Sequence, residues 1–148
     1  MIKDMPKSTR TEALDQSIIQ AQRYLLGLQY CQGFWRGELE ADATVTAGYI
    51  PLMYFMGTLD PVRQEKAVMF IRGQQRPDGT WSIFPGGPGD LNATVQCYFS
   101  LKLAGIEADD PMMIKAREFV LANGGIDKTH TFTKMLLSPL GQYEWDRL

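Results

Sequence analysis

A repeat of 46 residues constrains the fold of this chain more than any other feature of its sequence. The segment Gln29–Trp35 reads Gln-x3-Gly-x-Trp, and Gln75–Trp81 repeats the pattern with all three fixed residues displaced by 46 positions. The flanks repeat as well, since Ala43-Thr44-Val45 and Asp60-Pro61 return as Ala93-Thr94-Val95 and Asp110-Pro111. Self-similarity at such a period is typical of folds that stack one structural unit on the next.

Helix start and stop signals divide each repeat into two helices. An aspartate before a proline, as at Asp60-Pro61, places an N-cap acceptor ahead of the residue type favoured at the first helical position. Thr9 and Glu12 have the spacing of a capping box. Gly57 and Gly105 stand where a helix would end in a left-handed residue. These signals predict helices near residues 11–30, 42–56, 61–74, 91–104, 111–122 and 130–140.

The predicted helices fall into two alternating classes. The first, third and fifth are amphipathic, and the first has an apolar stripe made of Leu14, Ile18, Ala21, Leu25 and Leu28. The second, fourth and sixth carry almost no charge, and a helix that is apolar all round has to be covered all round. We therefore expect an all-α fold with apolar helices inside and amphipathic helices outside. This arrangement is a partial α/α toroid, about half of an (α/α)6 barrel, with an uncovered apolar edge at each end.

Composition and charge exclude several classes of function. The chain has 148 residues, a formal net charge of −2 and no basic block, so it lacks the electrostatic footprint of a nucleic-acid-binding protein. Residues 1–12 lack the apolar core of a signal peptide, and no stretch approaches the length of a membrane span. We expect an N-terminal arm over residues 1–10 and one domain over 11–148. The expected location is cytoplasmic, with peripheral attachment to the inner face of the cytoplasmic membrane as the alternative.

Residues for metal or nucleophilic chemistry are too sparse to form a site. Cys31 and Cys97 are far apart, and His130 is the only histidine in the sequence. We therefore expect no metal and no cofactor. The segment Pro85-Gly-Gly-Pro88 lacks the amide donors of a phosphate-binding loop, because prolines have no N–H. We interpret it as a rigid turn between an outer and an inner helix.

The paired Gln-x3-Gly-x-Trp patterns and Pro85-Gly-Gly-Pro88 resemble the QW motifs of triterpene cyclases, and of bacterial squalene–hopene cyclases in particular. The similarity runs from about Leu14 to Trp145 and includes Tyr98–Leu103 and Phe132–Met135. It implies a full chain several times longer with two α/α barrels, of which this stretch matches the first half of one. The implied activity is squalene cyclisation in hopanoid and triterpenoid biosynthesis, an isomerase reaction.

The resemblance also assigns roles to residues. The QW residues are implied to be structural rather than catalytic: Gln29, Gly33, Trp35, Gln75, Gly79 and Trp81. Each glutamine amide would stack on its tryptophan and satisfy unpaired backbone amides at the end of a neighbouring outer helix. Phe132 matches a family aromatic residue on an inner helix, and Tyr49 and Tyr98 also fall on inner helices, where aromatic faces stabilise carbocations. For these three residues, cavity lining and plain core packing are alternatives.

The acid that starts the family reaction is missing from this sequence. The resemblance implies a D-x-D-D motif, which the chain does not contain, and we interpret Asp109-Asp110 as a solvated helix start. Thr46, Gly48 and Gln96 stand where the family carries acidic side chains. We therefore expect no catalytic residue in this chain and no cyclisation by it alone. Squalene or a similar polyprenyl hydrocarbon would be a partner only if a C-terminal half completes the barrel.

Two other interpretations remain open. One is a non-catalytic half-toroid that serves as a binding or scaffold module, and the other is an inactive gene remnant. A split-cyclase partner or self-association would each cover the exposed apolar edges that the fold predicts.

Overall fold

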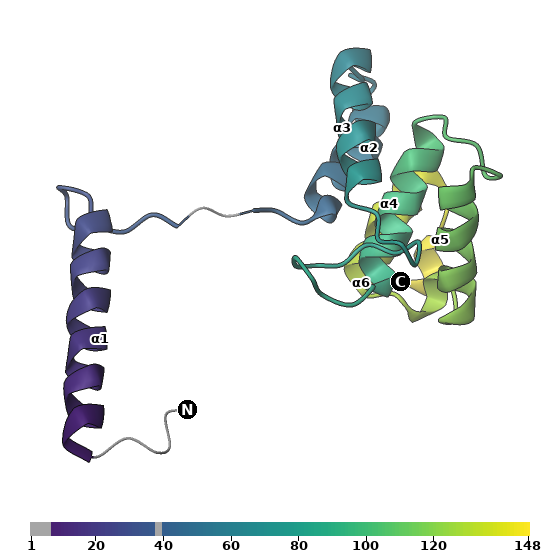
Figure 1. Cartoon of the computed structure of the whole chain (residues 1–148). Coiled ribbons are helices and arrows are strands. Elements are labelled where there is room, and N and C mark those ends of the chain that lie inside the picture. The colour runs from purple at the N-terminus through teal and green to yellow at the C-terminus, as the bar shows by residue number, and fades with distance from the viewer. Residues whose placement is uncertain (1–6, 38–39) are drawn as a thin grey trace. The chain divides into compact units, whose positions relative to one another are not determined.

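A computed structural model describes residues 7–37 and 40–148, which form two compact units divided between Glu40 and Ala41. The first unit holds α1 (Lys7–Leu28) and the turn that follows it. The second holds α2 (Ala43–Met56), α3 (Pro61–Gly73), α4 (Leu91–Leu103), α5 (Pro111–Ala122), α6 (Thr131–Leu137) and the 3-10 turns Ile126–Lys128, Ser138–Leu140 and Trp145–Arg147. Neither described range contains a strand, so the fold is all-α (Figure 1).

Within the second unit, the helices predicted to be inner contact one another in order. α4 packs against both α2 and α6. The amphipathic α3 packs against α2 and α4, and the amphipathic α5 packs against α4. Figure 1 shows α2 beside α3 and α4 beside α5. A row of nearly charge-free helices with amphipathic helices packed on it is the layering of an α/α toroid fragment.

α4 lies at the centre of the core. Its buried face contains Ala93, Cys97 and Leu101, which recur at one-turn spacing and share a hydrophobic cluster with Ile50 and Trp81. Burial raises the pKa of the Cys97 thiol well above its ordinary value, because the charged thiolate is disfavoured away from water. Cys97 is therefore a neutral core residue.

An interior proline in α2 is compensated by a residue of α4. Pro51 is buried in the middle of the helix and has no N–H to donate to Ala47 O, one turn earlier. The fully buried Ser100 hydroxyl donates to that carbonyl over 2.7 Å. Because a buried carbonyl without a partner is costly, this bond joins α2 to α4 at the point where the proline would otherwise weaken α2.

Helix starts in the second unit use two kinds of cap. Asp60 accepts from the backbone N–H of Val62, and Asp110 accepts from that of Met112, as the Asp-Pro signals predict. α6 has no such side chain at its own N-cap. Instead, Asn92 Oδ1 of α4 accepts from the backbone N–H of His130 over 2.7 Å. The start of α6 is therefore capped by α4 rather than by its own sequence.

Two predicted helix boundaries differ from the structure by three residues or more. α1 begins at Lys7 rather than near residue 11, so Thr9 lies inside the helix and residues 7–10 of the predicted arm are helical. This stretch contains no glycine or proline that would break a helix. Residues 1–6 of the arm lie outside the described residues. α6 ends at Leu137 rather than at 140, because Pro139 has no N–H and its ring clashes with the carbonyl one turn earlier.

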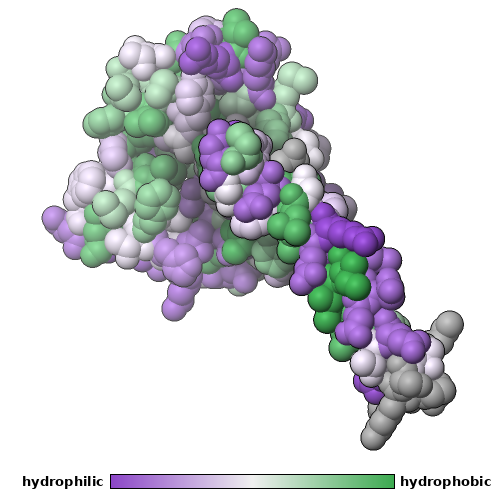
Figure 2. Space-filling view, turned by 90° about the vertical axis from the view of Figure 1, so that its left-hand side faces the viewer, coloured by the Kyte–Doolittle hydropathy of each residue, from purple (hydrophilic) through white to green (hydrophobic). Residues whose placement is uncertain are grey.

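Several apolar side chains remain exposed on the inner helices of the second unit. On α2, Leu52 and Phe55 are 51% and 65% exposed, and on α6, Phe132 and Met135 are 69% and 50% exposed. Figure 2 shows apolar side chains, in green, at the surface of the molecule. These helices are apolar all round, as the sequence indicates, but the other helices of the second unit do not cover them all round.

Candidate functional site: the two QW turns and the inner helices

The second QW motif forms a closed turn after α3. The backbone N–H of Arg76 donates to Thr80 O over 2.9 Å, and the N–H of Gly79 donates to Arg76 O over 2.9 Å. Gly79 has a φ of 86°, which glycine adopts without the steric cost of a side chain. A Cβ atom at Gly79 would come 2.3 Å from Lys115 Cβ. The turn therefore lies directly against α5.

The glutamine and tryptophan of this turn connect it to two outer helices. Gln75 Nε2 donates to Gly79 O and to Met112 O in the first turn of α5, each over 2.9 Å. Trp81 is fully buried, and its indole N–H donates to Ile71 O over 2.7 Å. Ile71 lies in the last turn of α3, where its carbonyl also accepts from the backbone N–H of Gln74 over 3.2 Å. The second QW motif thus joins α3 to α5.

The bonds differ in one respect from the role that the resemblance implied for the glutamine. We expected the side chain of Gln75 to satisfy unpaired backbone amides, but its NH2 group donates to two carbonyls. The reason is that this group carries only donors, and its partners have to be oxygen atoms. Stacking of the amide on Trp81 stays a prediction.

The first QW motif builds the same turn in the first unit. Gln29 Nε2 donates to Gly33 O over 2.8 Å, and the Trp35 indole N–H donates to Leu25 O over 2.7 Å. Gly33 has a φ of 87°. Each donor and acceptor lies 46 positions before its counterpart in the second turn. Within the first unit Trp35 is nevertheless 51% exposed, whereas Trp81 is buried within the second.

A polar cluster inside the second turn was not anticipated from the sequence. Asp78 Oδ1 accepts from the backbone N–H and the hydroxyl of Thr80, over 3.1 and 2.6 Å, and Asp78 Oδ2 pairs with Arg76 over 3.1 Å. The hydrogen bond from the Thr80 hydroxyl is the main reason that the pKa of Asp78 falls to about 2. The signal was available, because an aspartate that binds the backbone two residues on is a common turn former.

Neutral side chains join α4 to α6 where the family resemblance implies an acid. Gln96 Nε2 donates to Thr133 Oγ1 over 3.0 Å, and that hydroxyl donates to Asn92 Oδ1 over 3.2 Å. Gln96 and Thr133 are both buried. Neither an amide nor an aliphatic hydroxyl releases a proton to an alkene. This cluster therefore holds two inner helices together.

The three aromatic candidates lie in different surroundings. Tyr49 and Tyr98 are partly buried and pack against the main core cluster. Tyr98 also borders a cavity between α4 and α5. Phe132 is 69% exposed on α6. Core packing is thus part of the environment of the two tyrosines, and the lining of a substrate cavity stays a prediction for all three residues.

Within residues 7–37 and 40–148, no group of three His, Cys, Asp or Glu side chains is placed to hold a metal ion. None of the helices in these ranges is both long enough and apolar enough to cross a membrane. Cys31 is exposed and Cys97 is buried, and both are free thiols.

Comparison with known proteins identifies the family. The family described as the squalene-hopene cyclase N-terminal domain matches residues 18–148, a range that includes both QW turns and all the inner helices. The chain belongs to this family. Both QW turns and the layered helices of the second unit lie within or overlap the matched range.

Named relatives agree with this assignment. The chain is 37% identical to the squalene–hopene cyclase of Alicyclobacillus acidocaldarius, over 92% of this chain and 22% of that protein. It is 38% identical to the squalene–hopene cyclase of Zymomonas mobilis, over 95% of this chain and 22% of that protein. It is 35% identical to the dammaradiene synthase of Dryopteris crassirhizoma, over 89% of this chain and 19% of that protein. The chain therefore spans about a fifth of the length of these relatives.

Proposed function

We propose that this chain provides the N-terminal part of an α/α barrel in a triterpene cyclase that acts on squalene. The observation that carries the proposal is the doubled QW turn, in which glutamine and tryptophan make the same bonds to backbone carbonyls in both copies. The family match includes both turns. Relatives named as squalene–hopene cyclases support squalene as the substrate of the complete protein.

In this proposal the chain contributes rigidity and shape, and the proton comes from elsewhere. Cyclisation begins when a carboxylic acid transfers its proton to a terminal alkene carbon and leaves a carbocation. The D-x-D-D motif that supplies this acid in the family is absent from these 148 residues. Thr46, Gly48 and Gln96, at positions where the family is acidic, have no such proton to give. The inner helices would supply part of an apolar wall, including the ring of Phe132.

The chain by itself is expected to convert no squalene. Purified protein would be incubated with squalene in detergent, and the extract analysed for hopene and hopanol. Because the acid is missing and water would reach any cation formed, the yield should equal that of a sample without protein. Product above that control would contradict the proposal that the acid lies outside these residues.

A chimera tests whether this chain can provide the N-terminal part of an active cyclase. In the chimera, this chain would replace the part of the Alicyclobacillus acidocaldarius cyclase that it matches, which is 22% of that protein. The rest of that enzyme would be kept. We expect cyclised triterpene from the chimera and none from the same enzyme with that part deleted. A matched chimera that carries Trp81→Ala should lose activity in step with its loss of folded protein. A folded chimera without any cyclised product would overturn the proposal.

A non-catalytic binding or scaffold module is the competing function. The exposed apolar side chains of α2 and α6 would serve such a module as well as they serve a barrel. A folded but inactive chimera would favour the module. A cytoplasmic location, with or without peripheral membrane attachment, and pairing with a second half or a second copy belong to the same proposal. Cell fractionation and sedimentation of the purified chain check them.

A further inference from the structure

A cavity of about 430 Å³ lies between α4, α5 and the C-terminal residues of the second unit. Its volume falls within the range of roughly 300–1,000 Å³ that is usual for small-molecule sites. None of the QW residues lines it. The cavity is therefore distinct from the turns that define the family, and its chemistry has to be read from its own lining.

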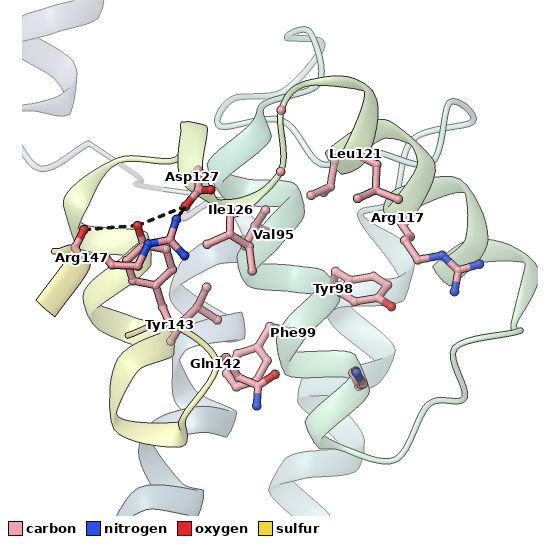
Figure 3. A pocket seen from close by; sticks show the side chains of 15 residues that line it. Val95, Tyr98, Phe99, Arg117, Leu121, Ile126, Asp127, Gln142, Tyr143 and Arg147 are labelled. Atoms are coloured by element: carbon pink, nitrogen blue, oxygen red, sulfur yellow. Dashed lines mark hydrogen bonds and ion pairs between the residues drawn. The ribbon is translucent and has the colours of Figure 1, made fainter. Parts of the chain in front are cut away.

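The inner wall of this cavity is apolar. Val95, Phe99 and Leu137 line it, are buried, and form a second hydrophobic cluster of their own. Val120 and Ile126 pack against that cluster and also line the cavity. Figure 3 shows the side chains of α4 and of the segment after α5 converging on the space. Such a wall shields a hydrocarbon chain from water.

The rim of the cavity is basic. Three basic side chains, Lys102, Arg117 and Arg147, line it with a single acid, Asp127, although the chain as a whole has a net charge of −2. Arg147 pairs with Asp127 over 2.7 Å and lies over the Tyr143 ring, 5.3 Å from its centroid. Figure 3 shows this group on one side of the cavity and Arg117 on the other.

The two other cations share a helix face with the apolar lining. Lys102 lies one turn after Phe99 on α4, and Arg117 lies one turn before Leu121 on α5, the spacing that places side chains on one face. Both cations are exposed, and neither forms an ion pair within the described part of the chain. Cations at the edge of an apolar cavity complement a ligand with an anionic head and a hydrocarbon tail.

We propose that this cavity binds a free single-chain carboxylate of the fatty-acid class. The carboxylate lies beside Lys102 and Arg117, and the tail lies against Val95 and Phe99. Binding makes and breaks no covalent bond. The proposal does not depend on cyclase function, because squalene carries no charged group for these cations to recognise.

Three ligands with the same tail and different heads test the charge argument. The 148-residue protein would be titrated by calorimetry with dodecanoate, dodecanol and dodecyltrimethylammonium, each below the concentration at which it forms micelles. We expect saturable binding of dodecanoate, about tenfold tighter than that of dodecanol, from two exposed ion pairs. The proposal would be overturned if dodecanoate showed no saturable binding, or if dodecyltrimethylammonium bound as tightly as dodecanoate.

Paired variants test the location. The double variant Lys102→Gln with Arg117→Gln should lose about tenfold in dodecanoate affinity and keep its dodecanol affinity. The matched control, Arg63→Gln with Lys66→Gln on α3, removes the same charge outside the cavity and should bind dodecanoate like the parent. Circular dichroism verifies that both remain folded. An equal loss in the two double variants, or dodecanoate-induced methyl shifts at Leu52 instead of Leu121 and Ile126, would refute the site.

Discussion

The two QW turns have the same internal hydrogen bonds and different surroundings. In both, the glutamine amide donates to the glycine carbonyl and the indole donates to a carbonyl ten residues earlier. Within its own unit, Gln75 makes a second bond, to Met112 O, and Gln29 has no such bond within the described part of the first unit. A Cβ atom at Gly79 would meet another helix of the second unit, whereas one at Gly33 would meet no atom in the described part of the first unit. The repeated sequence therefore defines the turn, while the packing of α5 turns the second copy into a connection between helices.

The two turns are also filled by different chemistry. Tyr30 and Phe34 stack in the first turn, with their ring centroids 4.8 Å apart. At the matching positions of the second turn, Arg76 and Thr80 bind Asp78. The backbone bond between these positions is present in both copies. An aromatic pair and a polar cluster are thus interchangeable, because the glycine conformation and the backbone bonds define the turn.

Replacing each tryptophan with alanine should give the largest difference between the two turns in the loss of unfolding free energy. Trp81→Ala should lower the free energy of unfolding by about 3–5 kcal/mol, because it empties a fully buried aromatic site. Trp35→Ala should cost about 1 kcal/mol if the first unit stands by itself, since within that unit it loses one hydrogen bond and a half-exposed ring. Urea unfolding followed by circular dichroism measures both. Equal losses would mean that the two tryptophans are equally buried and would end the contrast.

Replacing each turn glycine with alanine should give a smaller difference between the two turns in the loss of unfolding free energy. Both substitutions force a side chain into the left-handed region, at about 1–2 kcal/mol. Gly79→Ala adds the collision with Lys115, at about 1–3 kcal/mol for an overpacked contact. Gly33→Ala meets no atom in the described part of the first unit within 4 Å. The same unfolding experiment checks this, and a Gly33→Ala loss as large as that of Gly79→Ala would refute the close approach to α5.

Alanine at each glutamine tests the bond to α5. Gln75→Ala removes two hydrogen bonds and should cost about 1–3 kcal/mol, whereas Gln29→Ala removes one and should cost about 1 kcal/mol. Hydrogen exchange gives a more local measurement. Amides in the first turns of α5 should exchange faster in Gln75→Ala, and unchanged exchange there would show that the bond to Met112 contributes nothing.

The smallest effect concerns the polar filling of the second turn and depends on pH. Folding lowers the pKa of Asp78 to about 2. The ionised carboxylate therefore adds to the free energy of unfolding above the unfolded pKa of about 3.9, and this addition is lost as pH falls toward 2. In the Asp78→Asn variant, the free energy of unfolding should therefore decrease less than in the parent as pH falls through this range. Because Asp78 is half exposed, solvent screening keeps the effect small. If the free energy of unfolding changed with pH in the same way for parent and variant, Asp78 would not contribute to this pH dependence.

Much of the fold could be predicted because its signals act over a few residues. Asp60 and Asp110 cap the helices that follow them, and Gly57 has the left-handed φ of 64° expected at a helix end. The α6 boundary was missed although Pro139 is visible in the sequence, because the apolar pattern continued through it. The bond from Ser100 to Ala47 O was not predictable, since it joins residues 53 positions apart through helix packing.

The sequence by itself determined the repeat, the order of helices, the two QW turns and the membership of the family. Those features follow from backbone conformation, capping and periodicity, which are properties of neighbouring residues. The tertiary structure decided that Trp81 is buried within the second unit while Trp35 is half exposed within the first, and that Asn92 caps α6. It also placed Lys102 and Arg117 on the rim of one apolar cavity. These outcomes depend on which helix faces meet, and helices with the same local pattern can be covered by different neighbours.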